Sequence, residues 1–141
     1  MDVLYKAHAT ASGEGRSGRS RTDDGKIDVS LSMPKGLGGD DGPGTNPEQL
    51  FATGYAACYL SALKLVSGQA GTPVGKETQV HSTVGIGPNT RGEGFNLDIV
   101  LKITDHGLDQ AVIDDLIAKA HQVCPYSNAT RGNVNVALSA E

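Results

Sequence analysis

The sequence has little of three things: cysteine, positive charge and long apolar runs. Its 141 residues include two cysteines and carry a formal net charge of -4 at pH 7. An acidic chain lacks the basic surface that nucleic acid or an anionic membrane needs, so we expect neither as a partner. No stretch approaches the roughly 18 apolar residues of a membrane span, and the N-terminal residues show no basic segment followed by an apolar one. We therefore expect a cytoplasmic protein.

Cys58 and Cys124 are the only cysteines, and they lie 66 positions apart on two different predicted helices. A lasting structural disulfide is uncommon in the reducing cytoplasm, and a chain of this length can bury a core without one. Two thiols on separate helices can meet only through the fold, so redox chemistry is the first functional hypothesis. Taken singly, each cysteine could equally be a small apolar residue filling the core.

Several familiar site motifs are absent. The glycine-rich loop at residues 36–44 lacks the Gly-Lys-Ser/Thr ending of a P-loop, and no nucleophile elbow or Ser-His-Asp pattern is present. His121 and Cys124 form an H-x-x-C pattern, but zinc sites usually take close pairs of ligands from two places, whereas Cys58 stands alone in an apolar helix. We therefore expect no metal site and no nucleotide site.

The pattern of apolar residues predicts an α+β domain covering residues 1–141. Strands are expected at residues 3–10 and 26–31, as a hairpin around a Gly- and Ser-rich loop, and at residues 79–87, 95–103 and 133–138. A helix should begin at Pro47, with Asn46 as its N-cap, and end near Ser67. A second, amphipathic helix should span residues 108–123. The predicted order is β-β-α-β-β-α-β.

The first predicted helix is small or apolar around nearly its whole circumference, which is typical of a buried helix. Glu48 stands ten residues before Cys58 on it, about 15 Å away at 1.5 Å per residue. A direct contact between the two within one helix is therefore impossible. Glu48 could act through a long side chain such as arginine, or from the same helix of a second subunit packed antiparallel.

A buried thiol needs a nearby positive charge to become a nucleophilic thiolate, because apolar surroundings raise its pKa. The Gly- and Ser-rich loop between the first two predicted strands contains three arginines within six residues: Arg16, Arg19 and Arg21. They are the obvious source of this positive charge. The composition of this loop also fits a solvated, flexible segment without a functional role.

Three segments carry a family resemblance: GTNPEQLFA at residues 44–52, GYAAC at 54–58 and AHQVCPYSNATRGN at 120–133. The chain resembles the organic hydroperoxide resistance (Ohr) proteins, a branch of the OsmC-like superfamily, from about Val3 to Leu138. This resemblance implies an OsmC-like fold with buried central helices packed against antiparallel sheets, in an intertwined homodimer with active sites at the subunit interface. It also implies a thiol-dependent peroxidase without metal or organic cofactor, reducing organic hydroperoxides, including those of fatty acids.

The resemblance also implies roles for single residues. Cys58 is similar to the peroxidatic cysteine, Cys124 to the resolving cysteine, and Glu48 to the glutamate that orients a catalytic arginine. The family has a Gly-Gly-Arg-Asp-Gly context for that arginine, and residues 13–18 read GEGRSG here, so Arg16 fits best, although Arg19 also follows a glycine. Oxidation would give a Cys58 sulfenic acid and then a Cys58–Cys124 disulfide, which lipoylated protein or a small dithiol would reduce. The alternative is a non-catalytic thiol redox sensor or a lipid-binding module of the same fold.

Overall fold

The computed structural model describes residues 1–141, which form two compact units, Met1–Leu50 and Phe51–Glu141. Each unit has its own three-stranded sheet. The secondary structure is α+β, in the order β1-β2-β3-α1-β4-β5-α2-α3-β6 with two short 3-10 turns. Whether the chain behaves as one domain in solution stays a prediction.

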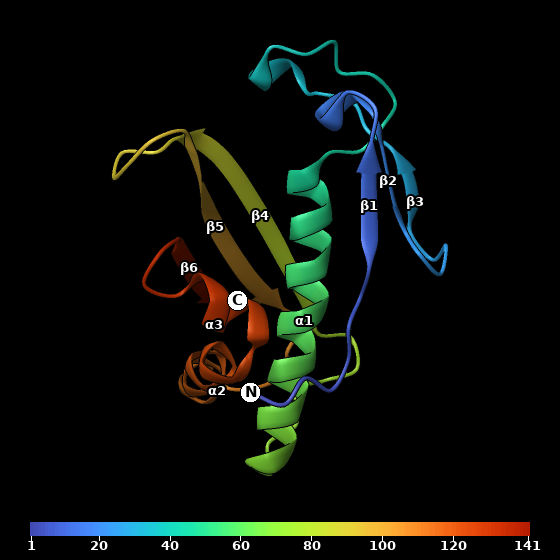
Figure 1. Ribbon diagram of the computed structural model, residues 1–141. Helices are drawn as coiled ribbons and strands as arrows, with labels where there is room; N and C mark the ends of the chain where they lie inside the picture. Colours follow the sequence, from blue (N-terminus) through green and yellow to red (C-terminus); the bar gives the residue numbers. More distant parts are fainter. The chain divides into compact units, whose positions relative to one another are not determined.

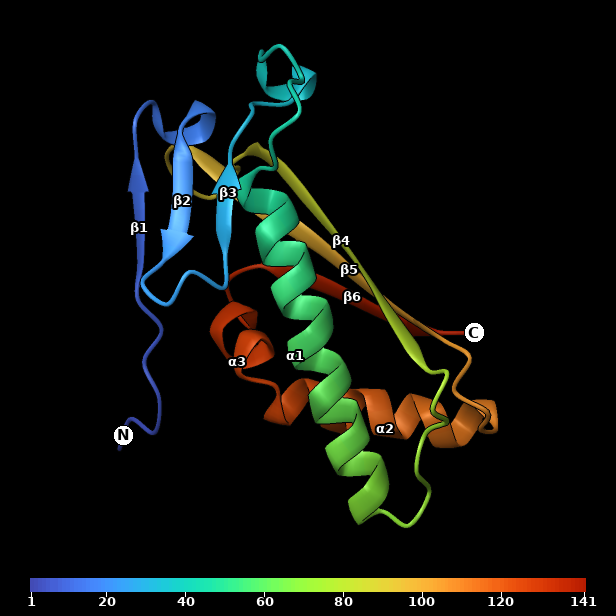
Figure 2. The same ribbon diagram turned by 90° about the vertical axis from the view of Figure 1, so that its right-hand side faces the viewer.

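The first unit is built on the strands β1 (Ala9–Ser12), β2 (Arg19–Thr22) and β3 (Asp28–Ser30). They pair antiparallel in the order β1-β2-β3 and lie side by side in Figure 2. The predicted two-stranded hairpin is therefore wrong in detail. The strand β2 lies between the two predicted strands, in the segment expected to be a loop, and β1 runs from Ala9 to Ser12 where the sequence predicts residues 3–10.

The long helix α1 (Pro47–Gln69) begins where the sequence predicts and ends two residues later than expected. The side-chain oxygen of Asn46 accepts a hydrogen bond from the main-chain N–H of Gln49 at 2.8 Å, which is the geometry of an N-cap. Pro47 occupies the first helical position, where its missing N–H costs nothing.

The second unit contains most of α1, the helices α2 (Gln110–Val123) and α3 (Pro125–Thr130), and the strands β4 (Gln79–Pro88), β5 (Phe95–Thr104) and β6 (Asn135–Ala140). The sheet order is β4-β5-β6, with β4 and β5 antiparallel but β5 and β6 parallel. The expected antiparallel pairing is present between β4 and β5, whereas β6 joins the sheet in parallel. A parallel neighbour requires a crossover connection, and α2 and α3 supply it.

One face of this sheet is buried beneath helices. Ile99, Leu101 and Ile103 alternate along β5 and are fully buried, while the intervening Val100 faces outward. The buried residues of α1 and α2 belong to the same apolar cluster, and both figures show the two helices crossing next to each other (Figures 1 and 2). The helix α1 is thus buried, as predicted, on the face that carries Tyr55, Tyr59 and Leu63, whereas Leu65 is exposed.

Contrary to the expectation that no stretch approaches a membrane span, the 23-residue helix α1 is long and apolar enough to cross a bilayer by length and composition alone. Core helices pass the same test, and α1 contributes several fully buried side chains to the apolar cluster of the second unit. Two of those side chains are tyrosines whose hydroxyls bond to other segments of the protein. These contacts favour the reading of α1 as a core helix.

Candidate active site

The two cysteines, 66 residues apart in the sequence, lie in contact. The Sγ atoms of Cys58 on α1 and Cys124 between α2 and α3 are 3.5 Å apart, and both thiols are free. A disulfide bond is about 2.05 Å long, so the sulfur atoms need to approach by about 1.5 Å to bond. Cys58 is partly accessible and Cys124 is fully buried. Only Cys58 is therefore open to an external reactant.

Cys124 is positioned by the break between α2 and α3. The next residue, Pro125, is the first residue of α3, and proline favours an extended backbone in the residue before it. Cys124 accordingly has φ -66° and ψ 124°, so the chain turns at this residue. Its main-chain N–H still donates to the Ala120 carbonyl, and its own carbonyl accepts from the N–H of Asn128, both at 2.9 Å. Both helix ends thus fix the Cys124 backbone.

The environment of Cys58 within the second unit disfavours its thiolate. Burial raises the pKa of Cys58, and the neighbouring Cys124 raises it further. The main-chain N–H of Tyr126, in the first turn of α3, hydrogen-bonds to the sulfur and lowers the pKa in part. No cation of the second unit contributes to the shift. A positive charge close to the sulfur would lower this pKa and favour the thiolate.

Aromatic side chains lie beside Cys58 on α1. Phe51 and Gly54 precede it by seven and four residues and so occupy the same helix face. The ring of Tyr126 lies 5.7 Å from that of Phe51, and its hydroxyl would be only 3.0 Å from a Cβ at position 54. Glycine at this position therefore lets the Tyr126 ring approach the helix closely.

A further set of hydrogen bonds, whose partners the sequence did not reveal, links buried tyrosines of α1 to α2 and α3. The buried hydroxyl of Tyr55 lies 2.9 Å from Ser127 Oγ and 3.2 Å from Thr130 Oγ1. One turn later, the buried hydroxyl of Tyr59 donates to the carbonyl of Ile117 on α2 at 2.7 Å. Burial raises the pKa of Tyr59 strongly, which keeps its phenol protonated as the donor. Two tyrosines of α1 thus bond to two different helices.

Arg16 and Glu48 form a bidentate ion pair in the first unit. The distances are 2.8 Å from Nη1 to Oε2 and 2.7 Å from Nη2 to Oε1. The hydrogen bond to Arg16 lowers the pKa of Glu48, and the same bond raises the pKa of Arg16. Arg16 sits in the 3-10 turn Gly15–Ser17 between β1 and β2. The pair is therefore fully charged at neutral pH.

Arg19 has a different partner. It forms a second bidentate pair with Asp28 across β2 and β3, with Nε to Oδ1 at 2.7 Å and Nη2 to Oδ2 at 2.5 Å. The Arg19 and Asp28 side chains are 58% and 39% exposed, against 34% and 12% for Arg16 and Glu48. Of the two arginines that the sequence left as candidates, only Arg16 binds Glu48.

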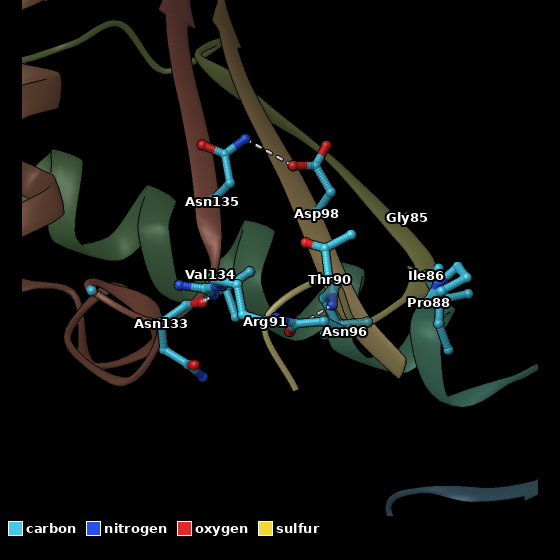
Figure 3. A pocket seen from close by; sticks show the side chains of 13 residues that line it. Gly85, Ile86, Pro88, Thr90, Arg91, Asn96, Asp98, Asn133, Val134 and Asn135 are labelled. Atoms are coloured by element: carbon cyan, nitrogen blue, oxygen red, sulfur yellow. Dashed lines mark hydrogen bonds between the residues drawn. The ribbon is translucent and has the colours of Figure 1, made fainter. Parts of the chain in front are cut away.

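The second unit also has an open pocket of about 640 Å³, lined by the end of β4, the start of β5, the hairpin between them and the residues leading into β6 (Figure 3). Its lining includes glycines and the polar residues Arg91, Asn96, Asp98 and Asn135. Asn135 Nδ2 donates to Asp98 Oδ1 at 2.8 Å, and Arg91 donates to the carbonyl of Asn133. Neither cysteine lines this pocket, so it is not part of the candidate site.

Comparison with known proteins identifies the family. Residues 38–139 match the family model described as OsmC-like protein. The chain is 52% identical to the organic hydroperoxide resistance protein of Xanthomonas axonopodis pv. citri (strain 306) over 137 residues, which cover 97% of this chain and 94% of that protein. The chain belongs to the OsmC/Ohr family. Organic hydroperoxide resistance protein OhrB of Bacillus subtilis (strain 168) is another Ohr relative, 38% identical over 96% of this chain and 97% of its own length.

Solved structures of Ohr proteins have the same fold. The crystal structure of an organic hydroperoxide resistance protein from Elizabethkingia anophelis matches with a TM-score of 0.91 and 48% identity, covering 100% of this chain and 99% of that one. The crystal structure of Bacillus subtilis OhrB matches with a TM-score of 0.87 over 99% and 100% of the two chains. The predicted OsmC-like fold is confirmed by these matches.

Proposed function

We propose that this Ohr-family protein is a thiol-dependent peroxidase that reduces organic hydroperoxides to alcohols. The observation that carries the proposal is the 3.5 Å contact between an accessible Cys58 and a buried Cys124 in a chain that has no other cysteine. An accessible thiol beside a buried one suits a division into an attacking and a resolving group. The Ohr names of its relatives support the same class of substrate.

The reaction balances with the groups present. The Cys58 thiolate attacks one oxygen of the peroxide bond; that bond breaks, and the alkoxide leaves as an alcohol after taking up a proton. Cys58 becomes a sulfenic acid, and the hydroperoxide is reduced by two electrons. The sulfur of Cys124 then attacks the sulfenic sulfur, the S–O bond breaks, and water leaves as the disulfide forms. The buried Cys124 thus protects Cys58 from further oxidation.

Arg16 is the proposed source of the positive charge that Cys58 lacks. A guanidinium keeps its charge at all relevant pH values and can hydrogen-bond to a thiolate and a peroxide oxygen together. The bidentate bond to Glu48 fixes the orientation of the Arg16 plane without removing its charge. Glu48 is then a positioning residue, because it stands about 15 Å along the helix from Cys58 and cannot reach the thiol itself.

The surroundings of Cys58 favour alkyl hydroperoxides over hydrogen peroxide. The ring of Phe51 lies on the α1 face that carries Cys58, and the ring of Tyr126 on α3 lies 5.7 Å from it. Both rings offer apolar surface to an alkyl chain. Hydrogen peroxide has no apolar part and gains nothing from that surface. The substrate class is therefore organic hydroperoxides, including those of fatty acids.

A dithiol completes the proposed cycle. It attacks the Cys58–Cys124 disulfide, passes through a mixed disulfide, and closes its own ring as both protein thiols are released. Dihydrolipoyl groups on proteins are the proposed physiological reductant, and small dithiols can replace them. We also propose that the protein works in the cytoplasm as a homodimer.

The decisive experiment measures consumption of a bulky alkyl hydroperoxide with dihydrolipoamide as reductant. We expect wild type to turn over, and faster than with hydrogen peroxide under the same dithiol supply. Cys58→Ser should lose peroxide reduction entirely. Cys124→Ser should still react once with peroxide but depend differently on the reductant, because no intramolecular disulfide can form.

Cys124→Ser is also the control for Cys58→Ser, because each variant removes one thiol of the pair but only Cys58→Ser removes the attacking one. Unchanged consumption by Cys58→Ser would mean that the cysteines only fill the core. Absence of steady-state consumption by wild type would instead favour a redox sensor or a lipid-binding module.

A further inference from the structure

Three buried hydroxyl groups form a cluster that takes no direct part in the proposed chemistry. The hydroxyl cluster consists of Tyr55 on α1 and of Ser127 and Thr130 on α3. All three residues are buried, and Tyr55 and Ser127 are fully so. The Thr130 hydroxyl donates in turn to the main-chain carbonyl of Tyr126 at 2.9 Å. A chain of hydrogen bonds thus runs from α1 to the α3 backbone.

The hydroxyl cluster and the thiol contact join the same two segments. Tyr55 stands three residues before Cys58 on α1, and Ser127 stands three residues after Cys124. Positions three apart on a helix are neighbours on one face. The 2.9 Å contact of Tyr55 with Ser127 and the 3.5 Å contact of the two sulfurs therefore lie about one helical turn apart.

The helix α3 depends on such contacts for its position. It has six residues, far fewer than the roughly 12 to 15 that an isolated helix needs in water. Pro125 interrupts the helical hydrogen bonds between α2 and α3, and an exposed hydrogen bond from the Arg131 side chain to the His121 carbonyl of α2 is the remaining polar tie at the other end of α3. In the second unit, Tyr55 supplies both a hydroxyl partner and a ring, at 5.6 Å from that of Tyr126, to this short helix.

We propose that Tyr55 is a positioning residue for the resolving step: its hydroxyl holds α3 so that Cys124 stays within reach of the Cys58 sulfenic sulfur. The inference rests on the proposed peroxidase function and adds to it a residue outside the reacting pair. In the step concerned, Cys124 Sγ forms the S–S bond while the Cys58 S–O bond breaks, with water as the leaving group. The sulfur atoms must close by about 1.5 Å, so a small displacement of α3 slows this step.

The chain offers a matched control. Tyr59 lies one turn after Tyr55 on α1, is equally buried, and gives its hydroxyl to the Ile117 carbonyl on α2. Tyr55→Phe and Tyr59→Phe each remove one buried hydroxyl and keep the ring. A merely stabilising hydroxyl would affect both variants alike, whereas a positioning role concerns Tyr55 alone.

The test follows a single turnover of the reduced protein with an alkyl hydroperoxide. We expect Tyr55→Phe to form the sulfenic acid at the wild-type rate but to convert it to the disulfide on the order of tenfold more slowly. The sulfenic acid then accumulates, and excess peroxide converts more of it to sulfinic acid, which intact-protein mass spectrometry detects. Tyr59→Phe should resolve at the wild-type rate.

A second measurement needs no peroxide. Equilibration of the thiol pair with a redox buffer of dithiothreitol should show a smaller disulfide fraction for Tyr55→Phe than for wild type and Tyr59→Phe. Should Tyr55→Phe fail to fold, Ser127→Ala removes the partner hydroxyl from the other side and should give the same two results.

The possible outcomes distinguish failure of the Tyr55 role from failure of the proposed peroxidase function. Equal resolution rates and equal disulfide fractions for Tyr55→Phe and Tyr59→Phe overturn the positioning role while leaving the peroxidase proposal intact. A wild-type protein that forms no disulfide with peroxide overturns both. A slower sulfenic acid formation in Tyr55→Phe, with unchanged resolution, assigns Tyr55 to the attacking step and also contradicts the inference.

Discussion

Arg16 and Arg19 are three residues apart and follow a glycine each, yet their side chains have different partners. Arg16 forms two hydrogen bonds with the largely buried Glu48, whereas Arg19 forms two with the exposed Asp28. Sequence context favoured Arg16 but could not exclude Arg19, because the choice depends on which carboxylate each side chain reaches in the fold. The structure supplies that information, and the catalytic role of Arg16 is the proposal built on it.

The Arg16–Glu48 pair should hold across the working pH range. Arg16 lowers the pKa of Glu48, so Glu48 is charged above the ordinary glutamate pKa of about 4.3. A depressed carboxyl pKa stabilises the fold fully above the unfolded value. That contribution is lost as the pH falls through the folded value. The guanidinium is therefore oriented at neutral pH and released only in acid.

Replacing Arg16 with glutamine should raise the pH at which the proposed peroxidase reacts. Burial raises the pKa of Cys58 within its own unit. Under the proposed role of Arg16, loss of the guanidinium leaves the thiolate to form only at higher pH. We expect the rate of sulfenic acid formation at pH 7 to fall on the order of 100-fold and to recover in part as the pH rises. The measurement is the pH dependence of single-turnover peroxide reduction.

Arg19→Gln is the matched control for this change. It removes a guanidinium with an equally bidentate carboxylate partner, three residues away. Its pH profile should match that of the wild type. A shifted profile for Arg19→Gln with a normal one for Arg16→Gln would reverse the assignment.

At the scale of elements, the sequence predicts best where periodicity is long. The predicted strands at 79–87 and 95–103 agree with β4 and β5 within one residue at each end, because each alternates over about ten residues. The strand β2, Arg19–Thr22, has no apolar residue to alternate, and its existence depends on partners on both sides. The helix α3 is too short for a helical period to show.

The residues of the candidate site stand out in the sequence, but the hydrogen bonds that hold the helices around them do not. Both cysteines, Glu48 and the arginine loop carry motifs that a single sequence reveals. The contact between Tyr55 and Ser127 joins positions 72 apart, and nothing in the sequence pairs Tyr55 with Ser127 rather than with another polar group. Two buried tyrosines within one apolar helix were the available signal, since a buried phenol needs a hydrogen-bond partner.

The turn that carries Arg16 requires glycine at position 18. A Cβ there would collide with the main-chain oxygen of Ser12, at the end of β1. We expect Gly18→Ala to lower the free energy of unfolding by about 1–3 kcal/mol. It should also slow sulfenic acid formation, because the backbone shift displaces Arg16. Chemical denaturation and single-turnover kinetics measure the two effects.

Gly36→Ala is the control, because Gly36 lies in another 3-10 turn of the same unit with open space around its Cα. It should leave both stability and rate near wild type. If Gly36→Ala loses as much rate as Gly18→Ala, the loss in Gly18→Ala does not come from displacement of Arg16.

For the whole molecule, the proposed chemistry needs groups from both compact units. The first unit contains the Arg16–Glu48 pair, and the second contains both cysteines. The second unit also exposes large apolar side chains, including Leu65 on α1 and Phe95 and Val100 on β5. A second copy that covered these side chains would remove apolar surface from water, which is the contribution that they would make to the proposed homodimer.

Mixed dimers test whether Arg16 acts on the thiol of its own chain or of its partner. We expect action on the partner's thiol, because Glu48, which binds Arg16, is about 15 Å from Cys58 along α1 of the same chain. A dimer of one Cys58→Ser chain and one Arg16→Gln chain, purified through two different affinity tags, then has one intact site and should show about half the wild-type rate. If Arg16 serves its own chain, the mixed dimer contains no intact site and is no faster than the Arg16→Gln homodimer. Light scattering on the same samples checks the dimer itself, and a monomer that is fully active would contradict the proposal outright.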